Sequence, residues 1–408
     1  MKYGLIGEHL GHSFSREVHG MLSGEPYELR ELSPAELPGF LAAREFDGIN
    51  VTIPYKEAVI PHLDYVSDEA RAIGAVNTIV KRDGKLFGYN TDYFGLKALA
   101  ESVGVILARR SVLILGAGGA AKTAAALARD EGAASVTHAV RTPRREGDIA
   151  LREIGRNNVY EVIINATPVG MYPDVEGRII DLSMFHHLRG VLDLVYNPIR
   201  TNLVIDAQEA GIPAAGGLMM LVAQAVKAQE FFRDFTFPEG TLQEVFGRLL
   251  CSKRNIVLTG MPSSGKSTLG KMLAERTGRP LTDTDELVCR NTGREIPEIF
   301  ATDGEMEFRR LESEAVRQAS CLHASIIATG GGVVLDPANI RRLKRNGRIF
   351  FVSRDIDKLV PTDDRPLSRD RGALERLFES RRNAYLASAE TIIDNNDTPE
   401  AAIAQFDI

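Results

Sequence analysis

Residues 111–132 read SVLILGAGGAAKTAAALARDEG, and residues 255–278 read NIVLTGMPSSGKSTLGKMLAERTG. Each stretch begins with an apolar run, continues through a glycine-rich turn and passes into a helical pattern. A strand, turn and helix in this order surround a phosphate with backbone N–H groups and the positive end of the helix. The two turns differ in type, so two different nucleotide sites are predicted.

Short apolar runs alternate with longer helical patterns along the rest of the chain, which predicts an α/β fold. The runs include KYGLIG, GINVTIP, EVIINATP and GVLDLVYNP in the first part, and SIIATGGG and RIFFVS in the last. We expect an α/β substrate domain, a Rossmann dinucleotide domain and then a P-loop α/β domain. The expected bounds are 1–100 completed by 216–246, then 101–215, a linker at 247–254 and a final domain at 255–408.

The composition is that of a globular protein, with 44% hydrophobic and 25% charged residues over 408 positions. A net charge of -6 argues against nucleic acid as the main partner. Cys251, Cys289 and Cys321 have no metal-ligand spacing, which favours reduced thiols. No signal peptide or membrane-length apolar run is present, so a cytoplasmic location is expected. The sequence does not indicate an oligomeric state.

The first turn fits the dinucleotide fingerprint, with alanine in its last position. Gly116 permits the tight turn, Gly118 lets the backbone approach a pyrophosphate, and Ala121 allows close packing of helix and strand. Where an NAD enzyme would place an acidic residue, the next strand leads into arginines, which suit a 2′-phosphate and favour NADP(H). The alternative is a solvated basic turn. The expected cofactor-binding residues are Gly116, Gly118, Gly119, Ala120, Ala121, Arg141, Thr142 and Arg145.

Short motifs on both sides of this turn carry further chemistry. They include HSFS at 12–15, NVTIPYK at 50–56, GAVNT at 74–78 and GYNTD at 88–92. Later motifs are NATPVGM at 165–171, DLVYNP at 193–198 and GLMMLVAQ at 217–224. In this set and order, residues 1–245 resemble the shikimate dehydrogenase family.

The resemblance implies reduction of 3-dehydroshikimate to shikimate. Lys56 and Asp92 match the family's catalytic pair, and a lysine beside a carboxylate can relay the proton that accompanies hydride transfer. Ser13 and Ser15 match the carboxylate-binding serines, and on an extended segment they would point the same way. The remaining expected substrate residues are Thr52, Asn77, Tyr196, Gly217 and Gln224.

The second turn matches the P-loop at every fixed position. Its N–H groups would hold the phosphates of ATP, Lys266 would reach the β and γ oxygens, and Ser267 would bind Mg²⁺. The expected nucleotide-binding residues are Gly260, Ser263, Ser264, Gly265, Lys266, Ser267 and Thr268.

The residues after the P-loop resemble shikimate kinase over about 254–400. Asp283 and Asp285 are expected at the end of a strand, facing one side, the first for the Mg²⁺ shell and the second for substrate hydroxyls. Arg309, paired with Glu312 at i, i+3, and Arg381 match the arginines that bind the shikimate carboxylate. Gly331 and Gly332 would let the backbone approach the substrate, and Arg365 matches the lid arginine that stabilises the phosphoryl in transfer. Arg342 and Arg345 are expected on the surface.

Three alternatives remain open at this stage. The first part could be a quinate/shikimate dehydrogenase with relaxed substrate and cofactor choice. The second could be another small-metabolite kinase, although such a kinase would not need two arginines for a carboxylate. One half could also be a degenerate regulatory module, against which the intact Lys56, Asp92 and Lys266 argue. The two implied reactions are consecutive, because the product of the first is the substrate of the second.

Overall fold

The computed structural model describes residues 1–11, 13–143, 146–155, 159–361 and 370–408. The chain divides into two compact units, Met1–Leu249 and Leu250–Ile408. The segment predicted as a linker lies largely within α8 (Thr241–Lys253), so helix continues through it. The finer domain bounds remain a prediction. No helix in the described part of the chain combines the length and apolar character needed to cross a membrane.

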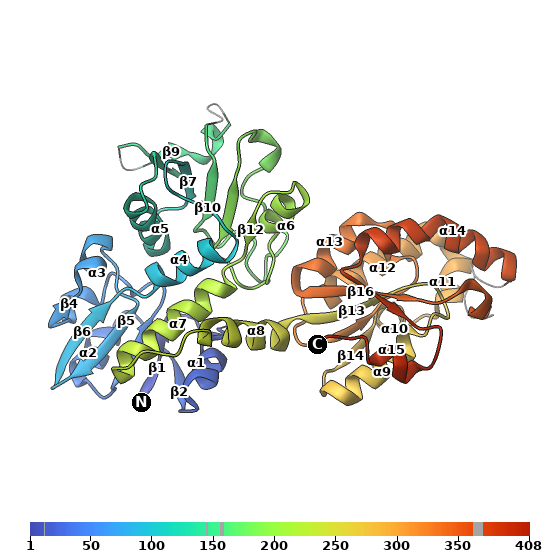
Figure 1. Ribbon diagram of the computed structural model, residues 1–408, viewed down its shortest axis with the longest axis horizontal. Helices are drawn as coiled ribbons and strands as arrows, with labels where there is room; N and C mark the ends of the chain where they lie inside the picture. Colours follow the sequence, from blue (N-terminus) through green and yellow to red (C-terminus); the bar gives the residue numbers. More distant parts are fainter. Residues whose placement is uncertain (12, 144–145, 156–158, 362–369) are drawn as a thin grey trace. The chain divides into compact units, whose positions relative to one another are not determined.

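The first unit begins with a mixed six-stranded sheet in the order β2-β1-β3-β5-β6-β4, which forms a substrate lobe (Figure 1). β1 pairs in parallel with β2 and β3, whereas β5 pairs antiparallel with β3 and β6. The strands are β1 (Tyr3–Gly7), β2 (Tyr27–Glu31), β3 (Gly48–Val51), β4 (Tyr65–Val66), β5 (Thr78–Arg82) and β6 (Lys85–Tyr89). The helices are α1 (Ser15–Ser23), α2 (Leu37–Ala43), α3 (Asp68–Ile73) and α4 (Asp92–Ser102).

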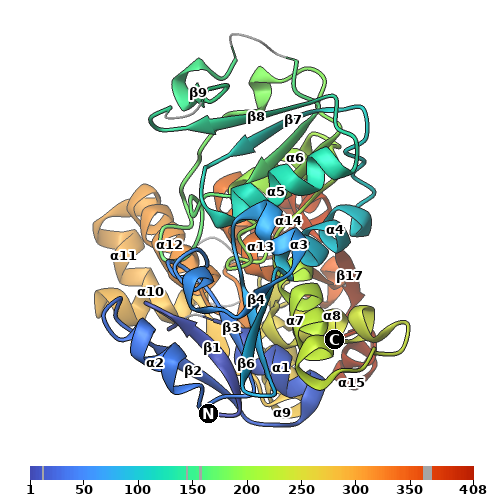
Figure 2. The same ribbon diagram turned by 90° about the vertical axis from the view of Figure 1, so that its left-hand side faces the viewer.

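A second sheet in the same unit is wholly parallel, in the order β12-β11-β10-β7-β8-β9, and forms a cofactor lobe (Figure 2). Numbered from β7, this is the doubly wound order 3-2-1-4-5-6 read from the other edge, as predicted for a Rossmann domain. The strands are β7 (Ser111–Leu115), β8 (Ser135–Val140), β9 (Ile149–Ala150), β10 (Val162–Asn165), β11 (Gly190–Asp193) and β12 (Ala214–Ala215). The helices are α5 (Gly119–Asp130) and α6 (Asn202–Glu209).

Helix α7 (Leu218–Arg233) joins the cores of the two lobes. Met219 and Met220 at its start pack in the core of the cofactor lobe, with α4 and α5. Phe232 at its end packs on β1 of the substrate lobe. α7 crosses α4 closely, because a Cβ on Gly95 would lie 2.6 Å from the carbonyl oxygen of Met220.

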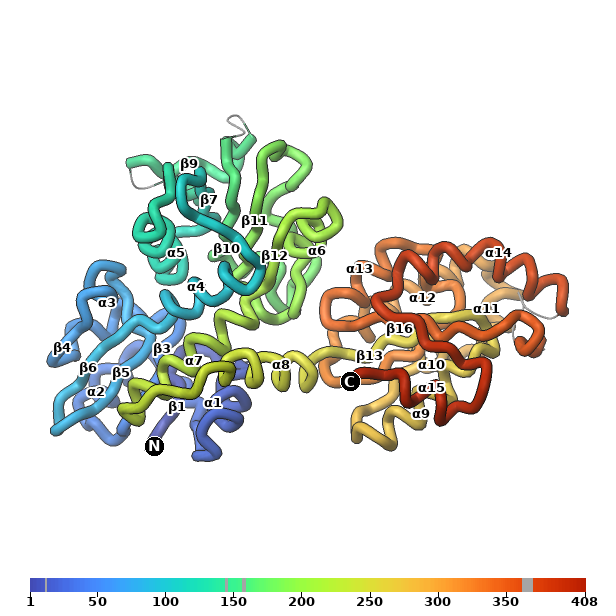
Figure 3. The backbone as a smooth tube through the Cα atoms, in the orientation of Figure 1, coloured from blue at the N-terminus to red at the C-terminus, as the bar shows by residue number. Residues whose placement is uncertain are grey.

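The second unit is a five-stranded parallel sheet in the order β14-β15-β13-β16-β17. α9 and α15 pack together against one face, and α12, α13 and α14 contribute to the core on the other (Figure 3). The strands are β13 (Asn255–Thr259), β14 (Leu281–Asp283), β15 (Ile326–Ala328), β16 (Gly347–Ser353) and β17 (Thr391–Asp394). The helices are α9 (Lys266–Thr277), α10 (Thr284–Thr292), α11 (Ile296–Thr302), α12 (Gly304–Ser320), α13 (Pro337–Asn346), α14 (Arg371–Ser388) and α15 (Pro399–Ile403).

The α/β fold is confirmed, and each quoted apolar run contains a strand. One expectation about the surface was wrong. Arg345 is buried, with 3% of its surface exposed, because it lies at the end of α13 beside the edge of the core, next to the buried Asn346. The three cysteines form no disulfide.

Candidate active sites

Lys56 and Asp92 meet in the first unit although they are distant in the sequence. Nζ of Lys56 donates to Oδ2 of Asp92 at 2.6 Å, and both side chains are largely buried. Lys56 follows β3, and Asp92 is the first residue of α4. The ion pair therefore fixes the ammonium group at the beginning of a helix, where the carboxylate is also favoured by the helix dipole.

The dinucleotide turn lies directly beside this pair. Gly116 has a φ of 113°, and α5 begins at Gly119. A Cβ on Gly119 would lie 3.7 Å from Cδ of Lys56. The helix end that is suited to a pyrophosphate therefore lies beside Lys56 of the Lys56–Asp92 pair.

The other expected substrate residues come from several parts of the first unit. Gln224 lies on α7, and its Cβ would be 3.2 Å from a Cβ on Gly95, one turn after Asp92. Tyr196 is half-buried, and desolvation raises the pKa of its hydroxyl, while a hydrogen bond with the side chain of Ser13 opposes this shift. The backbone N–H of Thr52 donates to the carbonyl oxygen of Ile6, and that of Gly217 donates to the carbonyl oxygen of Val195.

The two serines are near each other, but the extended segment expected for them was wrong. Ser15 is the first residue of α1, and its N–H donates to Oγ of Ser13 at 3.2 Å. The local turn into the helix replaces the alternation of a strand, because the hydroxyl of Ser13 can accept from this N–H. Their role toward a carboxylate remains a prediction.

Asn165 at the end of β10 and Asp193 at the end of β11 are buried and hydrogen-bonded to each other in the cofactor lobe. Asp193 accepts from the Asn165 amide at 2.9 Å, from the Val195 N–H at 3.0 Å and from the Thr201 hydroxyl at 2.6 Å. Burial raises the pKa of Asp193 to about 6. This network fixes the segment after β10, which packs against Gly116.

The basic residues expected at the adenosine end follow β8. Arg141 and Thr142 are exposed at its carboxyl end, whereas Arg145 lies outside the described residues. Within β8, Nδ1 of His138 lies 3.1 Å from the carbonyl oxygen of Gly116, so the strand also holds the dinucleotide turn. The role of Arg141 toward a 2′-phosphate remains a prediction.

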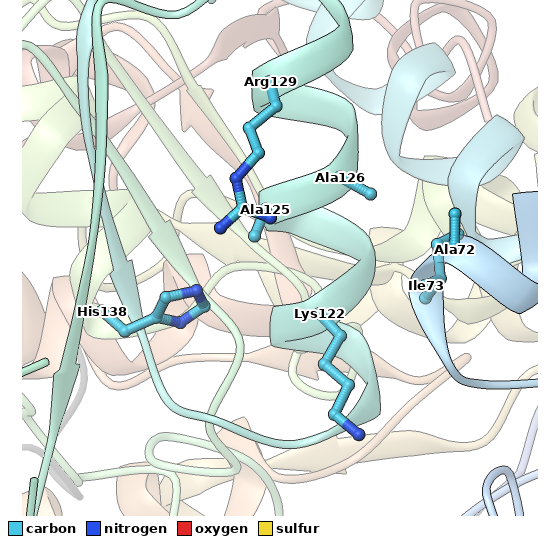
Figure 4. A pocket seen from close by; sticks show the side chains of 7 residues that line it. All are labelled: Ala72, Ile73, Lys122, Ala125, Ala126, Arg129 and His138. Carbon is cyan, nitrogen blue, oxygen red and sulfur yellow. The ribbon is translucent and has the colours of Figure 1, made fainter. Parts of the chain in front are cut away.

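A groove of about 250 Å³ is lined by residues of α3, α5 and β8 (Figure 4). Its charged lining is basic, and Lys122 within it pairs with Glu57 of the substrate lobe at 2.6 Å. The basic residues of the groove place positive charge beside α5. The ion pair between Lys122 and Glu57 connects the two lobes. Its lining residues are Ala72, Ile73, Lys122, Ala125, Ala126, Arg129 and His138.

The P-loop of the second unit follows the central strand β13. Gly260, Ser263 and Gly265 have φ values of 152°, 62° and 96°, which turn their N–H groups around a common hollow. Lys266 is buried and donates to the carbonyl oxygens of Gly260 at 2.9 Å and Met261 at 2.8 Å. Ser264 is buried, whereas Ser267 and Thr268 in the first turn of α9 are exposed. The loop has the shape of a phosphate cradle.

The two residues expected near Mg²⁺ are neighbours. Oγ of Ser267 lies 3.3 Å from Oδ2 of Asp283. Within the described ranges, no group of three or more His, Cys, Asp or Glu side chains is placed to hold a metal ion. A hydroxyl and one carboxylate fit Mg²⁺, which retains water and phosphate oxygens as its other ligands.

The expected strand alternation of Asp283 and Asp285 was wrong. Asp283 ends β14 and caps α10 by accepting from the N–H of Asp285 at 2.9 Å, so Asp285 lies in the first helical turn. The helix begins here because an aspartate at the N-cap satisfies an otherwise unpaired N–H group.

The glycine segment 330–332 brings the remaining kinase residues together. A Cβ on Gly330 would meet the carboxylate of Asp285 and lie 2.9 Å from that of Glu312, and one on Gly332 would meet the guanidinium of Arg309. Arg309 donates to Glu312 at 2.8 Å, as the i, i+3 spacing predicts. Burial raises the pKa of Glu312, while Arg309 opposes the shift. Only glycine leaves room for these groups to converge.

Two side chains of α14, Arg381 and Tyr385, also hold this segment. Arg381 donates to the carbonyl oxygen of Gly331 at 3.0 Å, and the hydroxyl of Tyr385 donates to the same oxygen at 2.5 Å. A Cβ on Gly331 would lie 3.0 Å from Cδ of Pro262 in the P-loop. The arginines, Asp285 and the P-loop thus surround one segment. Arg365 lies outside the described residues.

A doubly wound dinucleotide fold beside a Lys–Asp pair is typical of an oxidoreductase unit. A P-loop beside a glycine segment that two arginines contact is typical of a small-molecule phosphotransferase unit. Residues 5–79 match the family model for the shikimate dehydrogenase substrate-binding domain, and residues 262–406 match that for shikimate kinase. The chain belongs to the shikimate dehydrogenase family, and its second unit carries a shikimate kinase domain.

Relatives that match the first unit agree with the dehydrogenase assignment. A shikimate dehydrogenase (NADP(+)) of Clostridium perfringens is 34% identical over 266 residues, which cover 61% of this chain and 98% of the relative. Among solved structures, a chorismate mutase/shikimate 5-dehydrogenase fusion protein from Clostridium acetobutylicum matches with a TM-score of 0.58 and 34% identity, covering 60% and 96%. Shikimate 5-dehydrogenase from Thermus thermophilus, solved with NADP(H) and shikimate, matches with a TM-score of 0.55 and 32% identity, covering 61% and 99%.

Proposed function

We propose that the chain catalyses two consecutive reactions: NADPH-dependent reduction of 3-dehydroshikimate to shikimate, and ATP-dependent phosphorylation of shikimate to shikimate 3-phosphate. The observation that carries this proposal is the presence in one chain of two phosphate cradles, one beside the Lys56–Asp92 pair and the other beside Arg309 and Arg381. Both pockets suit a carboxylated ring with several hydroxyls.

In the dehydrogenase unit, Lys56 supplies the proton that reduction of a ketone requires. NADPH, when bound at the turn 116–121, supplies the hydride to the carbonyl carbon. Nζ of Lys56 delivers its proton to the carbonyl oxygen, and Asp92 stabilises the ammonium group beforehand and orients it. Ser13, Ser15 and Tyr196 would bind the substrate carboxylate, and the residues that would hold the ring hydroxyls are Thr52, Asn77 and Gln224.

In the kinase unit, Arg309 and Arg381 would bind the shikimate carboxylate by charge-assisted hydrogen bonds. Asp285 lies by Gly330 and would accept the proton of the attacking hydroxyl. The ATP–Mg²⁺ complex supplies the phosphoryl group when bound. Lys266 would leave the P-loop carbonyls for the β and γ oxygens, Ser267 and Asp283 would hold the metal side, and Arg365 would stabilise the charge of the phosphoryl in transfer.

Small molecules are the partners that these pockets fit. The net charge of -6 and the lack of any membrane-spanning helix among the described residues accord with an enzyme that works in the cytoplasm. The quinate-active alternative remains relevant, because quinate dehydrogenase from Corynebacterium glutamicum, solved with NAD, matches with 31% identity and a TM-score of 0.53.

Cofactor choice gives one prediction. Arg141→Ala should raise the KM for NADPH about tenfold or more and leave the KM for NADH nearly unchanged, because only NADPH carries the 2′-phosphate that the guanidinium would bind. Steady-state assays with each cofactor measure this. Arg189→Ala is the matched control, since Arg189 lies before β11, at the opposite end of the same sheet. Equal effects on both cofactors would contradict the role of Arg141.

One coupled assay tests the proposed function as a whole. Purified chain is supplied with 3-dehydroshikimate, NADPH, ATP and Mg²⁺, and shikimate 3-phosphate is sought by mass spectrometry. Its formation, with one NADPH and one ATP consumed per product, is expected. Shikimate without its phosphate would overturn the kinase assignment, and unreduced ketone would overturn the dehydrogenase assignment.

A further inference from the structure

Tyr385 joins the core of the second unit to the glycine segment beside the P-loop. It lies on α14, and none of its surface is exposed. Its ring stacks on Phe351 of β16, with ring centres 5.0 Å apart and planes 3° from parallel. Its hydroxyl donates to the carbonyl oxygen of Gly331 at 2.5 Å. A phenylalanine would fill nearly the same space, so packing accounts for the ring but not for the hydroxyl.

The same hydroxyl contacts Arg381, one helical turn earlier on α14. Nη1 of Arg381 donates to the carbonyl oxygen of Gly331 at 3.0 Å. Burial raises the pKa of Tyr385 to about 12, and the charge of Arg381 and a hydrogen bond with it oppose this shift. At this pKa the hydroxyl keeps its proton at neutral pH. It therefore accepts from the guanidinium and donates to the carbonyl oxygen at the same time.

Arg381 depends on these two contacts because its surroundings are closed and charged. Its exposed fraction is 4%, and its Nε has no hydrogen-bond partner among the described residues. Burial raises the pKa of Glu312, and the charges of Arg309 and Arg381 oppose this shift. Two guanidinium groups therefore lie near one carboxylate, and like charges repel. The neutral acceptors on Gly331 and Tyr385 hold Arg381 in one direction against this repulsion.

The carbonyl oxygen of Gly331 has a fixed place beside the phosphate cradle. A Cβ on Gly331 would lie 3.0 Å from Cδ of Pro262 in the P-loop. The N–H of the preceding Gly330 donates to the hydroxyl of Thr284, at the start of α10, at 2.9 Å. The segment is thus held from two sides. A guanidinium bound to this oxygen, as that of Arg381 is, has a defined direction relative to the cradle.

We propose, building on the kinase function proposed above, that Tyr385 is a positioning residue for substrate binding. Its hydroxyl fixes the direction of the Arg381 guanidinium, so that the N–H groups not used by Gly331 and Tyr385 face the substrate carboxylate. Without the hydroxyl, Arg381 keeps its charge but loses one of the two neutral acceptors described above. Its N–H groups then spread over more directions, and ordering them on binding lowers the affinity for shikimate.

The test compares Tyr385→Phe with Ser388→Ala in the full chain. Phenylalanine keeps the stacked ring and removes only the hydroxyl. Ser388 is buried on the same helix, and its hydroxyl donates to the carbonyl oxygen of Tyr385 at 3.0 Å, so Ser388→Ala also loses one buried hydrogen bond. We expect Tyr385→Phe to raise the KM for shikimate about five- to tenfold, as for loss of a hydrogen bond to a charged group. Its kcat and its KM for ATP should stay within about twofold, as should all three constants in Ser388→Ala.

A second background separates the positioning of Arg381 from a general weakening of the unit. Arg381→Lys keeps the charge but replaces the planar fork with a rotating ammonium group, whose direction matters less. In this background, Tyr385→Phe should raise the KM for shikimate by less than about twofold more. Thermal unfolding of each variant is measured on the same preparations, and Tyr385→Phe and Ser388→Ala should unfold at similar temperatures.

Three results would overturn the proposal. They are an unchanged KM for shikimate in Tyr385→Phe, an equal penalty in the Arg381→Lys background, and an unfolding temperature of Tyr385→Phe far below that of Ser388→Ala. Absence of shikimate phosphorylation by the wild type would instead overturn the proposed kinase function.

Discussion

Replacing Lys56 with alanine should lower the rate of NADPH oxidation with 3-dehydroshikimate by about a thousandfold, within the range for loss of a general acid. The variant loses the only group that we place to deliver a proton to the carbonyl oxygen, and Asp92 is left buried without its ion-pair partner. Consumption of ATP with shikimate should remain nearly unchanged, because the P-loop lies in the other unit. The two rates are measured spectrophotometrically on the same preparation.

Lys81 offers a matched control for this experiment. It lies on β5 of the same lobe and also pairs with an aspartate, Asp47, at 3.5 Å, but this pair is more exposed. Lys81→Ala should therefore leave the reduction rate within about twofold, since exposed ion pairs contribute little. A loss of both activities in Lys56→Ala would contradict two separable sites.

The second large effect is expected in the kinase unit. Lys266→Ala should reduce phosphorylation of shikimate by about a thousandfold, as expected for removal of charge stabilisation at the phosphoryl group. Reduction of 3-dehydroshikimate should continue at the rate of the wild type. Product formation is followed by coupled assay of ADP at saturating ATP.

A lysine of the same helix provides the control here. Lys271 is exposed on α9, about one turn beyond Lys266, and Lys271→Ala should phosphorylate shikimate normally. Thermal unfolding of both variants should be measured as well, because Lys266 donates to the carbonyl oxygens of Gly260 and Met261. A folded Lys266→Ala protein with an undiminished kinase rate would refute the P-loop assignment.

The phosphate cradles could be predicted from the sequence because their residues are contiguous. A strand, a glycine turn and a helix start determine the local backbone, and the structure shows this arrangement at Gly116–Gly119 and at Gly260–Lys266. The pairing of Lys56 with Asp92 was accessible only through the family resemblance. The two residues are 36 positions apart in the sequence, and the packing of α4 brings them together. No local sequence pattern predicts this packing.

Local sequence patterns also gave wrong predictions at two places where a helix begins. Alternation along a strand was expected for Ser13 with Ser15 and for Asp283 with Asp285, but in both cases the second residue lies in the first turn of a helix. A short polar side chain that can accept from the backbone favours the helix start over continued extension. At α10 the N-cap residue is Asp283, a residue type that favours a helix start, whereas the N-cap residue of α1 is Phe14, which gives no such signal.

The contacts that orient the site residues were the hardest to predict from the sequence. Tyr385 reaches Gly331 over 54 residues, and Asn77 meets Thr91 through the register of β5 and β6. A polar residue within an apolar run, such as Asn50 in GINV, is a sequence signal that could have indicated such a network. Its partners depend on which strands become neighbours.

The close crossing of α4 and α7 at Gly95 limits how the dehydrogenase could change its specificity. A methyl group at Gly95 would come within 3.2 Å of the Cβ of Gln224 and press on the main chain of Met220. The wall of the pocket between Asp92 and Gln224 is thus set by main-chain contact and not by exchangeable side chains. Evolution toward a bulkier acid would have to proceed through the loops that bear Ser13 and Thr52, where individual substitutions leave the helical framework intact.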